Sequence, residues 1–122
     1  MTIGGLQKLT LLDYPGKLAC TVFLAGCSLR CPYCHNPALV VSDGTNAALS
    51  EDELFAFLSS RVGKLDGVCV SGGEATVHPE LPVLLSMIRE LGFAVKLDTN
   101  GTNPRMLSEI LHEGLADYIA MD

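Results

Sequence analysis

The stretch GVCVSGGEATVHPELPVLLSMIRELGFAVKLDTNG, residues 67–101, decides the fold. It opens with a short apolar run and closes with a second β-rich run at 93–99. Between them, Pro79 or Pro82 starts a helix that stops at Gly92. Two strands joined by a helix form a right-handed βαβ unit with parallel strands. The stretch therefore predicts an α/β protein built on a parallel sheet.

The same alternation continues on both sides of this unit. Ser50 and Glu53 form a capping-box signature that opens a helix, and Asn103 followed by Pro104 opens another. The Pro-then-Gly chemistry of Asp13-Tyr-Pro-Gly16 predicts a tight turn. In chain order the expected elements are a short strand at 3–12, a strand at 18–24, a helix at 51–61, a strand at 67–71, the helix ending before Gly92, a strand at 93–99, a helix from Pro104 to Gly114 and a strand at 117–121.

Length and composition predict one soluble domain, spanning residues 1–122. Hydrophobic residues make up 48% and charged residues 18%, which is typical of a compact protein. The net charge is −6 without a Lys/Arg cluster, so nucleic acid is not an expected partner. No stretch approaches the ~18 apolar residues of a membrane-spanning helix, so no membrane association is expected.

The five cysteines indicate a metal site in a reducing compartment rather than a disulfide framework, because three of them crowd into residues 27–34. We therefore expect a cytoplasmic protein. An alternative is export as a lipoprotein, since Leu24-Ala-Gly-Cys27 imitates a lipoprotein cleavage site. The apolar stretch before it begins only at Leu18 and is shorter than a signal peptide needs.

Cys27, Cys31 and Cys34, spaced C-x3-C-x2-C, supply three soft thiolates of the kind that iron–sulfur clusters select. A [4Fe–4S] cluster held by three cysteines has one open iron. The alternative is a zinc site completed by His35 or His78, although zinc sites usually bring two close pairs of ligands. Cys20 and Cys69 lie in apolar runs, and we expect both to be buried core residues.

Unusual loops follow each predicted strand at the carboxyl edge of the sheet, where parallel sheets bind ligands. The cysteine segment follows the strand at 18–24, Gly72-Gly73-Glu74 follows the next, and Asp98-Thr-Asn-Gly101 ends the third. Two glycines allow close approach of a ligand, and Glu74 is suited to a positive charge. Lys96, Asp98 and Asn100 share one face of their strand, which predicts a polar cavity wall.

Taken together, these motifs resemble the radical S-adenosylmethionine superfamily, in which an aromatic residue precedes the third cysteine, as Tyr33 does here. Within it, Asp13-Tyr-Pro-Gly-Lys17, Cys-Pro-Tyr-Cys-His-Asn-Pro37 and Lys96-Leu-Asp-Thr-Asn-Gly-Thr-Asn-Pro104 look like activating enzymes of glycyl-radical proteins. Many relatives continue Gly-Gly-Glu with Pro, whereas this chain has Ala75.

The resemblance implies a role for each motif. The cysteines would hold a [4Fe–4S] cluster whose open iron binds S-adenosylmethionine, the Gly-Gly-Glu loop would meet the methionyl ammonium, and Tyr33 would meet the adenine. Acidic groups would also hold a monovalent cation. The implied ligands are Cys27, Cys31 and Cys34 for the cluster, and Tyr33, Gly72, Gly73, Glu74, Asp98, Asn100 and Asp122 for the cosubstrate or the cation.

The implied activity is reductive cleavage of S-adenosylmethionine to a 5′-deoxyadenosyl radical that generates a glycyl radical on a partner enzyme. The implied partners are anaerobic ribonucleotide reductase and a low-potential donor such as flavodoxin or ferredoxin. Three alternatives stay open: a radical enzyme acting on a small molecule, one acting on a peptide, and a non-catalytic zinc-binding module. The family fold is a partial (β/α)6 barrel, so we expect a core truncated at its fourth strand, near Asp122.

Overall fold

The computed structural model describes residues 3–11, 13–24, 50–72 and 74–121. Its elements agree closely with the predicted ones, and the strand that ends at Gly72 is one residue longer than expected. They are β1 (Ile3–Thr10), β2 (Ala19–Leu24), α2 (Glu51–Ser60), β3 (Gly67–Gly72), the short 3-10 helix η1 (Ala75–Val77), α3 (Leu81–Glu90), β4 (Ala94–Thr99), α4 (Pro104–His112) and β5 (Tyr118–Met121).

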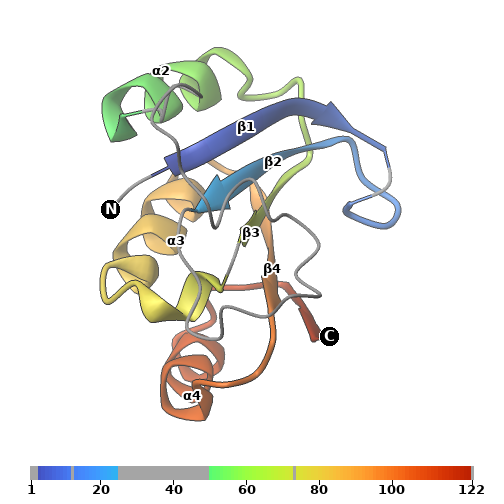
Figure 1. Cartoon of the computed structure of the whole chain (residues 1–122). Helices are drawn as coiled ribbons and strands as arrows, with labels where there is room; N and C mark the ends of the chain where they lie inside the picture. Colours follow the sequence, from blue (N-terminus) through green and yellow to red (C-terminus); the bar gives the residue numbers. More distant parts are fainter. Residues whose placement is uncertain (1–2, 12, 25–49, 73, 122) are drawn as a thin grey trace.

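The strands form one sheet in the order β1-β2-β3-β4-β5. Strands β2 to β5 pair in parallel, which confirms the predicted α/β class, while β1 pairs antiparallel with β2. Figure 1 shows α2, α3 and α4 together on one side of the fan of strands. The other face of the sheet is therefore left without a helix in the part of the chain that the structure describes.

The helix ends follow the predicted capping chemistry. The Ser50 hydroxyl accepts the Glu53 backbone N–H at 3.0 Å, and the Asn103 side chain accepts the Met106 backbone N–H at 3.2 Å. Helix α3 begins at Leu81 with Pro82 in its first turn, so Pro82 and not Pro79 marks the start. The helix η1 was not expected from the sequence, and it begins where the Glu74 side chain accepts the Thr76 backbone N–H.

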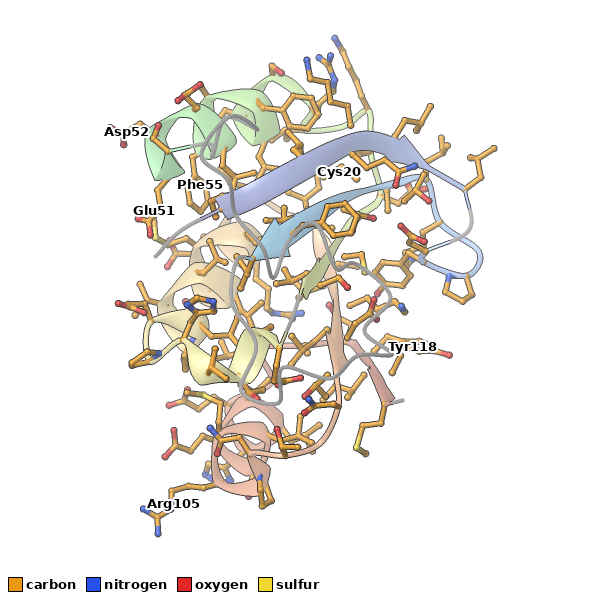
Figure 2. The ribbon with its side chains drawn as sticks, in the orientation of Figure 1. Cys20, Glu51, Asp52, Phe55, Arg105 and Tyr118 are labelled. Atoms are coloured by element: carbon orange, nitrogen blue, oxygen red, sulfur yellow. The ribbon has the colours of Figure 1, made fainter. Side chains whose placement is uncertain are left out.

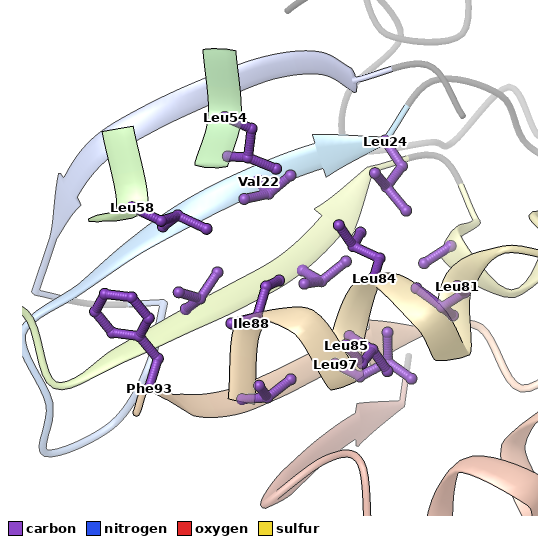
Figure 3. Packing of buried hydrophobic residues seen from close by; sticks show 14 of the residues in the cluster. Val22, Leu24, Leu54, Leu58, Leu81, Leu84, Leu85, Ile88, Phe93 and Leu97 are labelled. Carbon is purple, nitrogen blue, oxygen red and sulfur yellow. The ribbon is translucent and has the colours of Figure 1, made fainter. Parts of the chain in front are cut away.

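The apolar core lies between the sheet and its helices. Val22, Val70 and Leu97 are fully buried and point from three strands toward the helices. There they pack with the leucines of α2 and α3 and with Ile88 of α3. Figure 3 shows Leu54 and Leu58 of α2 above β2, and Leu84 and Ile88 of α3 beside β3 and β4. Burial of this face holds the strands in register.

One face of the sheet is covered by none of the described helices, and we call it the open face. Tyr14 covers this face at the amino-terminal ends of the strands. The turn predicted at Asp13–Gly16 is present: Lys17 N–H donates to the Tyr14 carbonyl at 3.1 Å, and Gly16 has φ +76°. The turn places the Tyr14 ring over Gly67, where an added Cβ would lie 3.0 Å from the ring edge and 3.0 Å from the Ala94 carbonyl oxygen. Gly67 is therefore needed for packing.

We expect Gly67→Ala to lower the free energy of unfolding by about 1–3 kcal/mol, because the new methyl group overpacks against Tyr14 and Ala94. Denaturant titration measures this loss. Adding Tyr14→Ala should make the two substitutions non-additive, because the first clash partner is then gone. Strictly additive losses would contradict the packing of Tyr14 on Gly67.

Candidate functional site

The sheet parts at its carboxyl edge between β3 and β4. Strand β3 remains paired with β2 as far as Leu24 opposite Gly72, whereas its last pair with β4 is Val70 opposite Leu97. In open parallel sheets, ligands bind where neighbouring strands diverge at their carboxyl ends. The loops predicted to carry function, after β3 and after β4, leave the sheet at this gap.

Gly72 allows β2 and β3 to approach closely at this edge. Its φ is +129°, and a Cβ at this position would lie 2.2 Å from the Leu24 carbonyl oxygen. The sequence suggested that a glycine here makes room for a ligand. The structure adds a second reason, because the backbone of Leu24 itself occupies that room. Leu24 is also the last described residue before the cysteine segment.

The Glu74 carboxylate bridges the gap between β3 and β4, and the residue is only 1% exposed. Its Oε2 accepts the Thr76 backbone N–H at 2.9 Å, the Thr76 hydroxyl, and the Thr99 hydroxyl at 2.8 Å. Its Oε1 accepts the Asn100 backbone N–H at 2.7 Å. The side chain thus connects the loop after β3 to the end of β4 through neutral donors.

Two asparagines stabilise the loop after β4. The Asn100 side chain accepts the Thr102 backbone N–H at 3.0 Å and the Thr102 hydroxyl at 2.6 Å, which is the bonding of an Asx turn. The Asn103 side-chain amide donates to the Thr76 carbonyl at 3.0 Å. The predicted role of Asn100 at a ligand stays a prediction, while its observed contacts shape the loop.

A polar cluster lies on the face of the sheet without helices, as the alternation along β4 predicted. Lys96 Nζ lies 2.5 Å from Asp98 Oδ1, and the Cys69 thiol donates to Asp98 Oδ2 at 3.4 Å. Lys96 Nζ is also 3.9 Å from Cys69 Sγ and 5.8 Å from the centre of the Tyr118 ring. Figure 2 shows Tyr118 on the side away from the helices.

This cluster occupies one level across the sheet. Thr21 of β2, Cys69 of β3, Lys96 of β4 and Tyr118 of β5 pair in succession along that level. Thr21, Cys69 and Lys96 are buried, and Asp98, one step nearer the carboxyl edge, is half-buried. Asp98 is therefore more accessible than Thr21, Cys69 and Lys96, while Tyr118 on the last strand is exposed.

Burial and charge act in opposite directions on the ionisable groups of this cluster. Burial alone would lower the pKa of Lys96, but hydrogen bonding to Asp98 and the nearby negative charges outweigh it, so the pKa of Lys96 is raised. Burial, reinforced by the Asp98 charge, raises the pKa of the Cys69 thiol to about 12. Lys96 therefore carries an ammonium and Cys69 a neutral thiol at physiological pH.

Several predicted site residues lie outside the described ranges. Within those ranges, no group of three or more His, Cys, Asp or Glu side chains is arranged to hold a metal ion. No helix there is long and apolar enough to cross a membrane. The predicted residues outside the ranges are Cys27, Cys31, Tyr33, Cys34, Gly73 and Asp122.

Thr76, Thr99 and Lys96 take part in the site although sequence reasoning did not select them as functional residues. Lys96 was expected only as one of several polar groups on its face. Thr99 lies inside the Asp-Thr-Asn-Gly segment, which was singled out as a unit. Thr76 and Lys96 contact residues only two positions away, Glu74 and Asp98, whereas Thr99 contacts Glu74 across 25 residues, and no local pattern signals that contact.

The fold and the sequence motifs of this chain are those of one protein superfamily. The profile of the Radical SAM superfamily matches residues 21–122, and the chain belongs to that superfamily. Membership implies a [4Fe–4S] cluster and S-adenosylmethionine. A crystal structure of QueE from Escherichia coli superposes with a TM-score of 0.63, at 22% sequence identity, over 83% of this chain and 52% of that one. That similarity supports the fold.

Curated relatives include activating enzymes. The pyruvate formate-lyase-activating enzyme of Clostridium pasteurianum is 33% identical over 98% of this chain and 51% of its own length. A Methanocaldococcus jannaschii protein with the provisional name glycyl-radical enzyme activating enzyme is 35% identical over 98% of this chain and 49% of its own length. The chain thus spans about half the length of these relatives.

The chain is also similar to relatives that are named as synthases rather than activating enzymes. The 7-carboxy-7-deazaguanine synthase of Aquifex aeolicus is 35% identical, over 65% of this chain and 34% of its own length. The similarity to the two activating enzymes described above extends over more of the chain.

We expect Gly72→Ala to lower the free energy of unfolding by more than about 3 kcal/mol, because strain at positive φ adds to a backbone clash with Leu24. Gly92→Ala is the matched control: its φ is +99°, but nothing lies within 4 Å of the added Cβ. The control should lose only about 1–2 kcal/mol. Equal losses in chemical denaturation would show that β2 and β3 do not approach as described.

We expect the free energy of unfolding of the metal-free, reduced chain to fall above pH 9, because two of its thiols are buried. Burial raises the pKa of Cys20 to about 11 and that of Cys69 to about 12, from 9.0. A raised pKa favours folding below the unfolded-state value, and this contribution is lost as pH rises toward the folded-state value. Between pH 9 and 10, each thiol should lower the free energy of unfolding by up to about 1.4 kcal/mol per pH unit.

Urea titrations across this pH range measure the slope. Replacing both residues with alanine lowers stability at every pH but should flatten the slope by the contribution of two thiols. An unchanged slope in that variant would contradict the burial of these thiols.

Proposed function

We propose that this protein is a radical S-adenosylmethionine enzyme of the activating type, which generates a glycyl radical on a partner enzyme. The observation that carries the proposal is the similarity to activating enzymes over 98% of the chain. It is supported by the gap at the carboxyl edge between β3 and β4, which lies beside Gly72 and is bridged by Glu74. The sequence motifs lead to the same candidate.

The residues present fit a cluster and its cosubstrate at this edge. Strand β2 delivers the chain to the cysteine segment from Leu24, and Leu24 pairs directly with Gly72, two residues before Glu74. The donor set in the sequence, three thiolates, is the chemistry that an iron–sulfur cluster selects. Cys27, Cys31 and Cys34 would hold the cluster.

A reduced [4Fe–4S] cluster supplies the electron that cleaves S-adenosylmethionine to methionine and a 5′-deoxyadenosyl radical. The Gly72-Gly73-Glu74 loop would orient the methionyl ammonium, and Tyr33 would stack on the adenine. Asp98, fixed by Lys96 and Cys69, offers a half-buried carboxylate near the carboxyl end of β4. This protein's task is orientation and exclusion of water rather than acid–base catalysis.

The proposed site also includes three further residues, Asn100, Asp98 and Asp122. Asn100 would act by fixing the loop that carries it. A monovalent cation at Asp98 and Asp122 has less support, because the Lys96 ammonium already neutralises Asp98. The proposed partners are a glycyl-radical enzyme, with anaerobic ribonucleotide reductase as the candidate, and a flavodoxin or ferredoxin as electron donor in the cytoplasm.

A second candidate is a radical enzyme that acts on a small molecule. The relatives named as 7-carboxy-7-deazaguanine synthases favour it, although their similarity covers less of the chain. The two candidates share the cluster and the cosubstrate, and they differ in where the radical goes.

Anaerobic reconstitution of the full chain with iron and sulfide tests the shared chemistry. We expect about four irons per chain and, on reduction with S-adenosylmethionine, the formation of 5′-deoxyadenosine measured by chromatography. Cys31→Ser should lose both signals, whereas the control Cys20→Ala, at a buried core position, should keep them. Stoichiometric zinc without cleavage would overturn the proposal in favour of a zinc-binding module.

Electron paramagnetic resonance of the reaction with anaerobic ribonucleotide reductase separates the two candidates. A glycyl radical on that partner supports the activating role. Cleavage of S-adenosylmethionine without a radical on any glycyl-radical partner, together with formation of 7-carboxy-7-deazaguanine, would favour the small-molecule role.

A further inference from the structure

We propose that the Lys96 ammonium takes the place of a bound monovalent cation at Asp98, so that this chain binds no such ion there. The inference rests on the proposed function, because the resemblance to radical enzymes is what implied a cation held by acidic groups that include Asp98. It makes Lys96 a positioning residue, which holds the Asp98 carboxylate in place and neutralises its charge.

Both oxygens of the Asp98 carboxylate are engaged by donors of this chain. Lys96 Nζ lies 2.5 Å from Oδ1, and the Cys69 thiol donates to Oδ2 at 3.4 Å. An alkali ion on either oxygen would lie within a few ångströms of this ammonium, and two positive charges at that distance repel each other. Displacing the ammonium instead would leave a buried charge without its partner, which is strongly unfavourable.

Neighbouring strands hold the ammonium in place. The Lys96 side chain is 10% exposed, against 32% for that of Asp98. Its Nζ lies 3.9 Å from Cys69 Sγ on β3 and 5.8 Å from the centre of the Tyr118 ring on β5, whose face attracts a cation. The Tyr118 ring lies 6.2 Å from the ring of Tyr14. Lys96 is therefore a fixed charge of the open face rather than a solvated surface lysine.

A second carboxylate shares this ammonium. Asp13 Oδ2 accepts the Thr21 hydroxyl at 2.7 Å, and Thr21 stands at the same level of the sheet as Cys69 and Lys96. The charge of Asp13 acts on Lys96 as well as that of Asp98 does. Without the lysine, two carboxylates would make this part of the open face negative, and such a surface attracts a cation.

Lys96→Met tests the inference because methionine keeps much of the side-chain volume and removes the charge. The measurement is urea unfolding of the metal-free full chain in choline chloride and in sodium or potassium chloride at equal ionic strength, so that screening stays constant. On replacing about 0.1 M choline with the alkali ion, the unfolding equilibrium constant of the variant should fall about tenfold, as for an ion with a Kd of about 10 mM. That of the parent should change by less than about twofold, because only screening acts on it.

Two further variants are controls. Arg89→Met breaks a different ion pair, with Asp117, whose side chains are 36% and 40% exposed. Water solvates the Asp117 carboxylate left behind, so this variant should respond to the alkali ion as the parent does. Lys96→Met combined with Asp98→Asn removes both charges of the buried pair, and the alkali response should fall to that of the parent.

Binding of S-adenosylmethionine to the cluster-loaded parent supplies a second readout, which needs no variant. Equilibrium dialysis should give the same affinity within about twofold in choline, sodium and potassium chloride, because the chain itself supplies the charge at Asp98 and screening is equal. An affinity that falls about tenfold in choline would overturn the inference.

The urea titrations separate the inference from the proposed function. A parent that responds to the alkali ion as strongly as expected for Lys96→Met would overturn the inference, and so would a folded Lys96→Met variant that shows no alkali response. If the variant does not fold in either salt, the response of the parent decides. A loaded parent with about four irons that binds no S-adenosylmethionine in any salt would overturn the proposed function, while the metal-free chain still reports on Lys96.

Discussion

A carboxylate buried at the edge of a sheet must be satisfied by donors from the protein, and Glu74 obtains them from both sides of a gap. Its acceptor oxygens join a loop that follows β3 to the end of β4, beyond the last pair of the ladder. Among the described residues, the hydrogen bond from Asn103 to the Thr76 carbonyl is a second connection between these loops. The spacing between the loop after β3 and the end of β4 depends on these two side chains.

The two faces of the sheet divide structural and functional tasks. The face beneath the helices is apolar and supplies the core, which holds the strands in register. The opposite face carries Lys96, Asp98 and Cys69, which satisfy one another at the wall of the open side. An ion pair here costs less desolvation than it would in the core, because Asp98 remains half-buried.

This division suits chemistry in which the cofactor and the cosubstrate do the bond breaking. For such chemistry the protein needs rigid loops at one edge and a floor that excludes water. Tyr14 packs over Gly67 at one end of the sheet, and Gly72 lets β2 and β3 approach closely at the carboxyl edge. Each of these close approaches requires a residue without a Cβ atom, which explains why positions 67 and 72 are both glycine.

The sequence by itself determined the strands, the helices, their caps, the burial of Cys20 and Cys69 and the polar face of β4, because periodicity and capping are local properties. The antiparallel pairing of β1, the helix η1 and the donors to Glu74 came only with the tertiary structure. Thr99 and Asn100 stand 25 and 26 residues from Glu74 in the chain. Only the register of β3 against β4 brings them together, and no local pattern encodes that register.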